Sequence, residues 1–374
     1  MNRRERESAR MTEREEQLHA RVLAAGPSWT GQHGARLGAG AVAALVYAFS
    51  FALAAFAVWA LVAWSNRLFG ILTALLVGWV LWESRPRRPR LPDQGVLAPD
   101  EAPVLRGLLE EIGERLGTPP PSTIVLDRRI NASVIGGRGG RRLAIGVPLW
   151  LALSPQARVA LLAHELGHFA SGDTRRTLWV GGALNILRAW TVMLRGPAHE
   201  LGDRFGYPSP EGVTLDFLHV VSRAIMWVFG AVPYALGRIL LRITRRDARG
   251  AEYAADVHAW RIAGREGALE LLTCLQREAG LTVALQRAAM APGGDVLAAA
   301  ASFRPEGPAP TADAPRPSNP LDTHPPVGLR LEVVAALPPF DGEVRLDSDR
   351  VRRMEAELAA RMREIERRIR DSFL

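Results

Sequence analysis

The sequence predicts a mainly α-helical chain with a small β-sheet, the α+β class, in which a transmembrane hairpin precedes one folded domain. Two observations predict this class. Two long apolar stretches near the start have a single charged residue between them. After them, apolar residues recur mostly at helical spacing, except in three short runs with the composition of strands. With 374 residues, the part after the hairpin is long enough to bury a sizeable core.

The polar composition excludes several classes of chemistry. All 47 basic residues are arginine, against 39 acidic residues, which gives a formal net charge of +8. Without lysine the chain has neither a lysine-containing phosphate loop nor Schiff-base chemistry. The single cysteine, Cys274, excludes an intramolecular disulfide and a cysteine-rich metal site. No nucleic-acid-binding motif accompanies the basic charge, so we expect no nucleic acid partner.

Residues 1–36 are a polar N-terminal segment, too polar for a cleavable signal peptide. Residues 37–64 then run without a charge, and 28 residues at about 1.5 Å each are enough to cross a hydrocarbon core of about 30 Å. Residues 68–82 form a second uncharged run. We therefore predict a transmembrane hairpin over residues 37–84. The alternative is one span followed by a buried or interfacial helix.

Arginine counts predict how the hairpin is oriented. Seven arginines precede the first span and four follow the second within residues 85–90, whereas the connecting turn has only Arg67. The positive-inside rule therefore places both ends, and the domain that follows, on the cytoplasmic side. We expect a multi-pass protein of the cell membrane, with the lipid bilayer among its partners.

The main domain is predicted over residues 92–340. It opens with a helix at Pro103–Leu116 that ends at Gly117. Three short strands follow, at residues 122–126, 132–136 and 142–147. The glycine-rich turn between the last two joins strands and carries no lysine, so it is not a phosphate loop.

Helices are predicted for most of the rest of this domain. One has clear ends, because Ser154 can cap it, Pro155 suits its first turn and Gly172 suits its close. Residues 178–195 and 213–243 are apolar but interrupted by charges, so they are either further membrane segments or helices that lie on the domain at the bilayer surface. Two more helices are predicted, at about 250–264 and 266–279.

The C-terminal part of the chain holds a predicted loop and a predicted helix. Residues 291–322 are rich in proline and alanine, which is typical of a flexible loop. Residues 345–374 predict a charged helix with an apolar stripe. The stripe consists of Val351, Met354, Leu358, Met362, Ile365 and Ile369. It belongs to a solvated amphipathic helix, or it packs on a partner helix, on a second copy of the chain, or on the domain itself.

The sequence His164-Glu165-Leu166-Gly167-His168, an HExxH motif, is the strongest chemical signal. Histidines four apart on a helix lie on one face, about 6 Å apart along the axis, so both imidazoles can bind one Zn²⁺ at about 2.0–2.1 Å. Glu165 can take a proton from water that attacks a peptide carbonyl and pass it to the leaving amine. The alternative is a polar helix face without a metal, but the apolar run Val159–Ala163 and the capped start favour a core helix.

A catalytic zinc needs a third protein ligand and an open position. Glu252 and Asp256 are four apart on a predicted helix and project to one side. Glu252 can ligate, and Asp256 can accept the free ring N–H of a ligand histidine. On these residues alone, the simpler interpretation is a surface helix whose carboxylates pair with Arg249.

Together these motifs resemble the M48 family of metallopeptidases, which includes HtpX-like membrane heat-shock proteases and CAAX prenyl proteases. The resemblance is carried, in order, by Asn131-Ala132 before a strand, the HExxH motif, Arg249-x-x-Glu252-Tyr253-x-Ala255-Asp256, and Thr323-His324-Pro325-Pro326 with Arg330. It runs from about residue 100 to 335, and the N-terminal hairpin fits HtpX-like members. It implies a zincin-like metallopeptidase domain with one Zn²⁺ per chain, held by His164, His168 and Glu252.

The resemblance also implies roles for residues outside the metal set. Asn131, Ala132 and Ser133 would hold an extended substrate peptide by pairing at a strand edge. His324 and Arg330 would lie near the cleft as catalytic residues that stabilise the oxyanion. Ser133 departs from the family, in which a bulky apolar residue is common at that place.

The expected function is that of a membrane-anchored zinc-dependent endopeptidase that cleaves protein or peptide substrates, in quality control of membrane or misfolded proteins. Two alternatives stay open. One is a processing peptidase for specific, CAAX-like peptides, although prenyl proteases of this type have more membrane spans than this sequence indicates. The other is a non-catalytic M48-like membrane protein that binds partners through residues 345–374, but it would leave Glu165 without a purpose.

Overall fold

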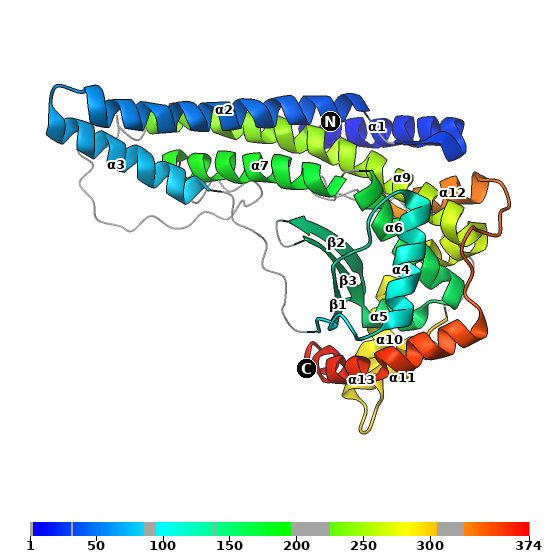
Figure 1. Ribbon diagram of the computed structural model, residues 1–374. Coiled ribbons are helices and arrows are strands. Elements are labelled where there is room, and N and C mark those ends of the chain that lie inside the picture. Colours follow the sequence, from blue (N-terminus) through cyan, green and yellow to red (C-terminus); the bar gives the residue numbers. More distant parts are fainter. Residues whose placement is uncertain are drawn as a thin grey trace. The chain divides into compact units, whose positions relative to one another are not determined.

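The computed structural model describes seven stretches of the chain (Figure 1). These are residues 3–30, 33–85, 95–137, 140–171, 173–195, 225–304 and 325–373. The chain is mainly helical and has one three-stranded sheet, which confirms the predicted fold class. It divides into two compact units. The first unit comprises Met1–Gly31, Leu91–Arg175 and Ala248–Leu374, and the second comprises Gln32–Arg90 and Arg176–Asp247.

The second unit contains the predicted hairpin, formed by α2 (His33–Ala63) and α3 (Arg67–Ser84). Asn66 ends the connecting turn, because its side chain accepts a hydrogen bond from the backbone N–H of Phe69 at the start of α3. The two helices approach closely at Gly70, where a Cβ would lie 2.4 Å from the carbonyl oxygen of Ala60. A cluster of aromatic rings at this end of the hairpin suits a membrane interface. Its members are Phe56, Trp59, Trp64 and Phe69.

The second unit also includes most of α7 (Asp173–Arg195) and the first part of α9 (Ala231–Gln276), whereas the sequence predicted the hairpin alone as a separate segment. Small and branched side chains of these helices and of α2 form one buried cluster. It includes Ala39, Ala43 and Val46 of α2, Val180, Ala183 and Leu187 of α7, and Leu240 of α9. The apolar stretch 178–195 is therefore helical, as is 225–243, while residues 213–224 lie outside the described part.

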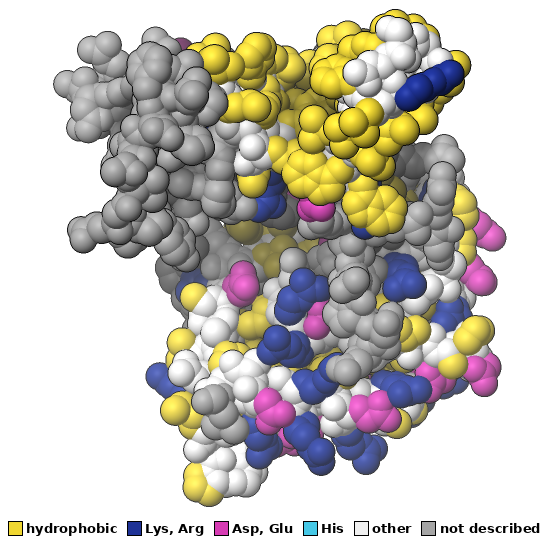
Figure 2. All heavy atoms as spheres, turned by 90° about the vertical axis from the view of Figure 1, so that its left-hand side faces the viewer, with side chains coloured by type: hydrophobic (Ala, Val, Ile, Leu, Met, Phe, Trp, Pro, Cys, Tyr) yellow, Lys and Arg dark blue, Asp and Glu magenta, His cyan; other side chains and the backbone are white. Residues whose placement is uncertain are grey.

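Three helices among the described residues are long and apolar enough to cross a membrane, namely Arg36–Ala63, Arg67–Ser84 and Ile225–Gln276. Figure 2 shows hydrophobic side chains gathered over α2 and α3, whereas arginine and acidic side chains are spread over the surface of the first unit. The exposed large side chains include Leu45, Phe51, Val58, Leu68, Leu72 and Leu75. In water such a surface would be costly, so it fits association with a membrane.

The sheet of the first unit has the strand order β1-β3-β2, with β1 at Thr123–Asp127, β2 at Ala132–Gly137 and β3 at Gly140–Gly146. These strands agree with the three that the sequence predicts. β1 runs parallel to β3 with Val125 opposite Ala144, and β2 runs antiparallel to β3 with Val134 opposite Leu143. Among the described residues β2 pairs with β3 alone, which leaves its other edge available.

Helices cover the sheet of the first unit (Figure 1). α4 (Pro103–Leu116) ends at Gly117, which has a left-handed φ of 65° as the sequence predicts for a glycine at that place. α5 (Val147–Ala152) and α6 (Pro155–Ala170) follow β3. Ser154 caps α6 by accepting a hydrogen bond from the N–H of Ala157, as predicted, while Gly172 lies outside the described residues.

The prediction of a helix that starts near Gly250 is wrong at its beginning. α9 runs without a break from Ala231 through Gly250, because a single glycine inside a helix costs only about 1 kcal/mol and is tolerated. The predicted break at Gly264 is confirmed: its φ of 85° and ψ of 166° separate the two helical parts of α9. A Cβ at Gly264 would lie 2.7 Å from backbone atoms of Phe340 and Asp341.

Part of the predicted loop 291–322 is helical. After α10 (Glu278–Met290), α11 spans Val296–Ser302. Asp295 caps α11 by accepting a hydrogen bond from the N–H of Ala298, and the burial of Val296 and Ala300 stabilises the short helix against the core. Residues 305–322 lie outside the described part, so the prediction of a flexible loop there stays a prediction.

The apolar stripe of the C-terminal helix α13 (Ser348–Asp371) packs on the domain itself. Met354, Leu358, Met362, Ile365 and Ile369 are all buried in the core of the first unit. Ion pairs flank the stripe, at 2.8 Å for Arg158–Glu355, 2.7 Å for Arg350–Glu111 and 2.9 Å for Arg361–Glu101. We expected a partner helix or self-association because of this stripe, but the stripe packs inside the domain. The described helices not yet introduced are α1 (Arg3–Ala25), the short 3₁₀ helix η1 (Gly26–Ser28) that follows it, and α12 (Val327–Ala336).

Candidate metal centre

The helix α6 carries both histidines in its last two turns, and contacts at its start and middle hold it in place. The carboxylate of Glu270, on α9, accepts a hydrogen bond from the backbone N–H of Ser154 at 2.8 Å, which fixes the start of the helix. The run Val159–Ala163 is buried on all sides, as expected of a core helix. His164, Glu165 and His168 follow this run, and the first two are buried. The buried last turns of α6 therefore present both imidazoles.

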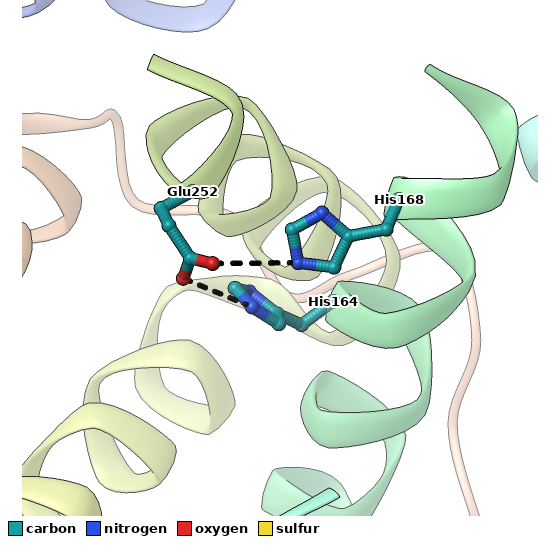
Figure 3. A group of neighbouring side chains, drawn as sticks. All are labelled: His164, His168 and Glu252. Atoms are coloured by element: carbon teal, nitrogen blue, oxygen red, sulfur yellow. Dashed lines mark ion pairs between the residues drawn. The ribbon is translucent and has the colours of Figure 1, made fainter. Parts of the chain in front are cut away.

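Glu252 of α9 faces the two imidazoles (Figure 3). Its Oε2 lies 3.6 Å from Nε2 of His164, and its Oε1 lies 3.7 Å from Nε2 of His168. One donor atom from each of the three residues lies within 4.8 Å of the other two. The imidazole rings are nearly perpendicular, with centroids 5.0 Å apart. The structure thus brings together the three residues that the sequence predicts as metal ligands, from helices about 90 residues apart in the chain.

The donor set suits a divalent transition metal. Two imidazole nitrogens and one carboxylate oxygen are a ligand set of catalytic zinc sites, in which a fourth position stays open. Ligands at about 2.0–2.1 Å from a tetrahedral ion are about 3.3–3.4 Å from each other. The two separations from Glu252, 3.6 and 3.7 Å, exceed this by a few tenths of an ångström. Small side-chain rotations would close that difference.

A second layer of charged groups orients these ligands. Oδ1 of Asp256 lies 3.1 Å from Nδ1 of His164, as the sequence predicts for the carboxylate that receives the free ring N–H. Arg330 of α12 donates to both oxygens of Asp256, from Nε at 2.8 Å and from Nη2 at 2.7 Å. Its Nη1 lies 3.2 Å from Oε2 of Glu252. A single guanidinium therefore holds the candidate ligand and the carboxylate behind it in one geometry.

The electrostatics of the site favour a cation between these groups. Burial lowers the pKa of His164, but its contacts with Asp256 and Glu252 outweigh burial and raise the pKa to about 10. Burial likewise lowers the pKa of Arg330, and the same two carboxylates raise it overall. In the absence of a metal ion, the imidazole of His164 thus carries a proton near neutral pH. A metal ion would take over the positive charge that this proton supplies.

Gly167 is a residue of the site to which the sequence pattern assigns no role of its own, although it stands inside the HExxH motif. A Cβ at this position would lie 3.0 Å from Cδ2 of His258 and 3.4 Å from Cα of Ala255, both on α9. The missing side chain therefore lets α6 and α9 approach closely at the level of the ligands. The signal in the sequence was the glycine itself, because glycine inside a helix is unfavourable unless close packing requires it.

Arg330 lies at the candidate metal centre, with its Nη1 3.2 Å from Oε2 of Glu252. Its guanidinium is buried and engaged by Asp256 and Glu252, while the predicted role toward the oxyanion stays a prediction. Its geometry assigns it a positioning role behind the metal ligands. His324, predicted for the same role, lies outside the described residues. Glu165 lies in α6 between the two histidines and is buried. Its role as general base stays a prediction.

The three residues predicted to bind substrate lie at the edge of the sheet. Asn131 is exposed and precedes β2, where its side chain accepts a hydrogen bond from the N–H of Ala132. Ala132 is buried and Ser133 is half-buried within β2. The strand packs beside α6, the helix that carries the histidines (Figure 1). An edge strand next to the candidate ligands is the arrangement that substrate binding by strand addition needs.

Comparison with known families agrees with this geometry. The family model described as peptidase family M48 matches residues 99–337, which is more than half of the 374 residues. The match includes β1–β3, α6, the ligand-bearing part of α9 and α12. It does not extend to α1, to the hairpin of α2 and α3 or to α13.

Proposed function

The chain belongs to peptidase family M48 and is a metallopeptidase, and we propose that it is a membrane-anchored zinc endopeptidase of the HtpX-like kind. His164, His168 and Glu252 would hold one Zn²⁺ per chain. The observation that carries the proposal is that one donor atom from each of these three residues lies within 4.8 Å of the other two. Two neutral imidazoles and a carboxylate favour zinc among the available divalent ions, because they supply its preferred nitrogen and oxygen ligands.

The residues of the chain divide the chemistry among them. When bound, zinc would supply Lewis-acid activation at the scissile carbonyl. Glu165 would take the proton of the attacking water and deliver it to the leaving amine, as a general base and then a general acid. Asp256 would hold the tautomer of His164 that presents Nε2 as the ligand atom, and Arg330 would keep Glu252 turned toward the imidazoles.

The proposed substrates are proteins or peptides in extended form. β2 has one edge that no described strand occupies, and an extended peptide placed there would pair with its backbone. Backbone pairing gives little sequence selectivity, which suits an enzyme that acts on many different chains. Asn131, Ala132 and Ser133 at the start of this edge would contact the peptide nearest to α6. We propose membrane proteins and misfolded proteins as the natural substrates, in quality control.

We propose the cell membrane as the location, with the metal centre on the cytoplasmic side. The support is the three helices of membrane-spanning length among the described residues and the arginine bias at the two ends of the hairpin. Cys274 is the single cysteine and is buried, so a cysteine introduced at the exposed position of Glu110 would be the one that a thiol reagent labels. Glu110→Cys should react with a membrane-impermeant maleimide only after the cells are permeabilised. Equal labelling of intact cells would contradict the cytoplasmic side.

The proposed catalytic role is tested by Glu165→Gln. The change keeps the size of the side chain but removes its basicity, so peptide cleavage should fall by about 10²–10⁴-fold while bound zinc is unchanged. Glu110→Gln, at an exposed position of α4, is the matched control and should cleave like the parent protein. If Glu165→Gln cleaves at the parental rate, Glu165 is not the general base.

A further inference from the structure

The N-terminal helix α1 lies outside the family match, yet it packs against the elements that position Glu252. Leu18 and Val22 of α1 are buried together with Tyr253 of α9 and Val333 of α12. Tyr253 is the residue after the candidate ligand Glu252, and Val333 lies one helical turn after Arg330. Apolar contacts from a single helix thus reach both α9 and α12.

Polar contacts strengthen the same arrangement. The carboxylate of Glu15 lies 3.3 Å from Nη1 of Arg249, and both side chains are buried. The indole N–H of Trp29, directly after η1, donates a hydrogen bond to the carbonyl oxygen of Gly250 at 2.9 Å. Nε2 of His19 lies 3.3 Å from Oε2 of Glu332 on α12. Arg249 and Gly250 come three and two residues before Glu252, and Tyr253 comes directly after it, so α1 and Trp29 contact α9 on both sides of the ligand in the chain.

We propose that α1 is a positioning element of the metal centre, which holds α9 against α12 so that Glu252 faces His164 and His168. The inference rests on the proposed function, since it assigns α1 a role toward the same metal. The side chains that dock α1 are Glu15, Leu18, Val22 and Trp29. They act through Arg249, Gly250 and Tyr253, and none of them is a candidate ligand. Groups one layer behind metal ligands commonly change metal affinity by about 10–100-fold, and α1 supports such a layer.

The experiment compares zinc affinity across variants of the full-length protein in detergent, measured by competition with a chelator. Leu18→Ala/Val22→Ala removes the apolar contacts, and Glu15→Arg separately places a second arginine beside Arg249. Both should weaken zinc binding by about tenfold or more. With Co²⁺ in place of zinc, the visible absorption of both variants should lose the intensity of a four-coordinate site, which reports the ligand geometry without an activity assay.

Matched controls lie on the exposed face of the same helix. The control variants are Leu23→Ala, at a side chain that is 39% exposed, and Glu16→Arg, at an exposed side chain. Both should bind zinc like the parent protein. Met354→Ala in α13 creates a core defect in the same unit, remote in sequence from α1. It should lower the melting temperature while it leaves zinc affinity within about twofold of the parent, because it does not touch the layer behind the ligands.

The outcomes separate this inference from the proposed function. If the parent protein binds no zinc, the proposed function fails. If the parent binds zinc and the two α1 variants bind it equally well, α1 has no positioning role and the peptidase assignment stands. Equal weakening of zinc binding by the α1 variants and by Met354→Ala would also overturn the inference, because the effect would then be general destabilisation.

Discussion

Replacing Arg330 with methionine would leave two buried carboxylates without their guanidinium. Arg330 is 4% exposed, and the carboxylates that it contacts, Glu252 and Asp256, are 5% and 1% exposed. Nε and Nη2 form a bidentate pair with Asp256, while Nη1 lies 3.2 Å from Glu252. Methionine has a similar length and fills the same space without charge, so the change tests electrostatics more than packing.

The magnitude follows from the burial of the three groups. Removing one partner of a buried ion pair typically costs about 3–5 kcal/mol, because the charge that remains has lost both water and its partner. For a unit of this size, that loss lowers the melting temperature by an amount on the order of 10 °C. Zinc would compensate Glu252 but not Asp256, so the loss should be smaller in the zinc-loaded protein. The melting temperature of Arg330→Lys should lie between those of the parent protein and of Arg330→Met, because lysine keeps the charge but cannot form the bidentate pair.

The assay is thermal unfolding of the detergent-purified protein with and without zinc. Arg287→Met is the matched control, because Arg287 lies exposed on α10 and its change should shift the melting temperature by no more than about 2 °C. If Arg330→Met melts at the same temperature as Arg287→Met in the absence of zinc, then Arg330 does not hold the buried carboxylates, and its positioning role is refuted.

Two further predictions follow from the site. Gly167→Ala should gain about 1 kcal/mol of helix propensity but crowd His258 at 3.0 Å, so zinc affinity should fall by about tenfold. Gly107→Ala in α4, where a Cβ meets nothing within 4 Å, should only stabilise, and parental zinc affinity in Gly167→Ala would contradict the close approach. Because the pKa of His164 without metal is about 10, zinc binding near pH 7–8 should release about one proton and strengthen about tenfold per pH unit. Calorimetry in buffers of different ionisation enthalpy measures that proton, and no release would show that the imidazole is already neutral.

Local signals in the sequence were enough for much of this fold. Short apolar runs bounded by turns predicted β1, β2 and β3, and the residues Ser154 and Gly117 predicted helix ends that the structure places there. Each of these depends on residues close together in the chain, which is why pattern reasoning reaches them. The HExxH motif also defines its own geometry, because four residues are about one turn of a helix.

What the sequence did not predict depends on contacts between distant residues. The bidentate pairing of Arg330 with Asp256, 74 residues away, gives Arg330 a positioning role that the residues around it in the sequence do not indicate. α11 forms in a proline- and alanine-rich stretch because Val296 and Ala300 meet the core. The apolar stripe of α13 can be predicted from its own sequence. Its packing partners are α4, α10, α11 and β1, and they cannot be predicted from the sequence of α13 alone. Tertiary burial decided each of these cases.

The most direct test of the central assignment is the metal content of the purified protein and of Glu252→Ala, measured side by side by atomic emission. The three donors within 4.8 Å predict about one zinc per chain in the parent protein. In Glu252→Ala, loss of the carboxylate between two imidazoles should leave less than about a tenth of that zinc after dialysis against a weak chelator. One zinc per chain in both proteins would show that Glu252 is not a ligand and would contradict the site described for this peptidase.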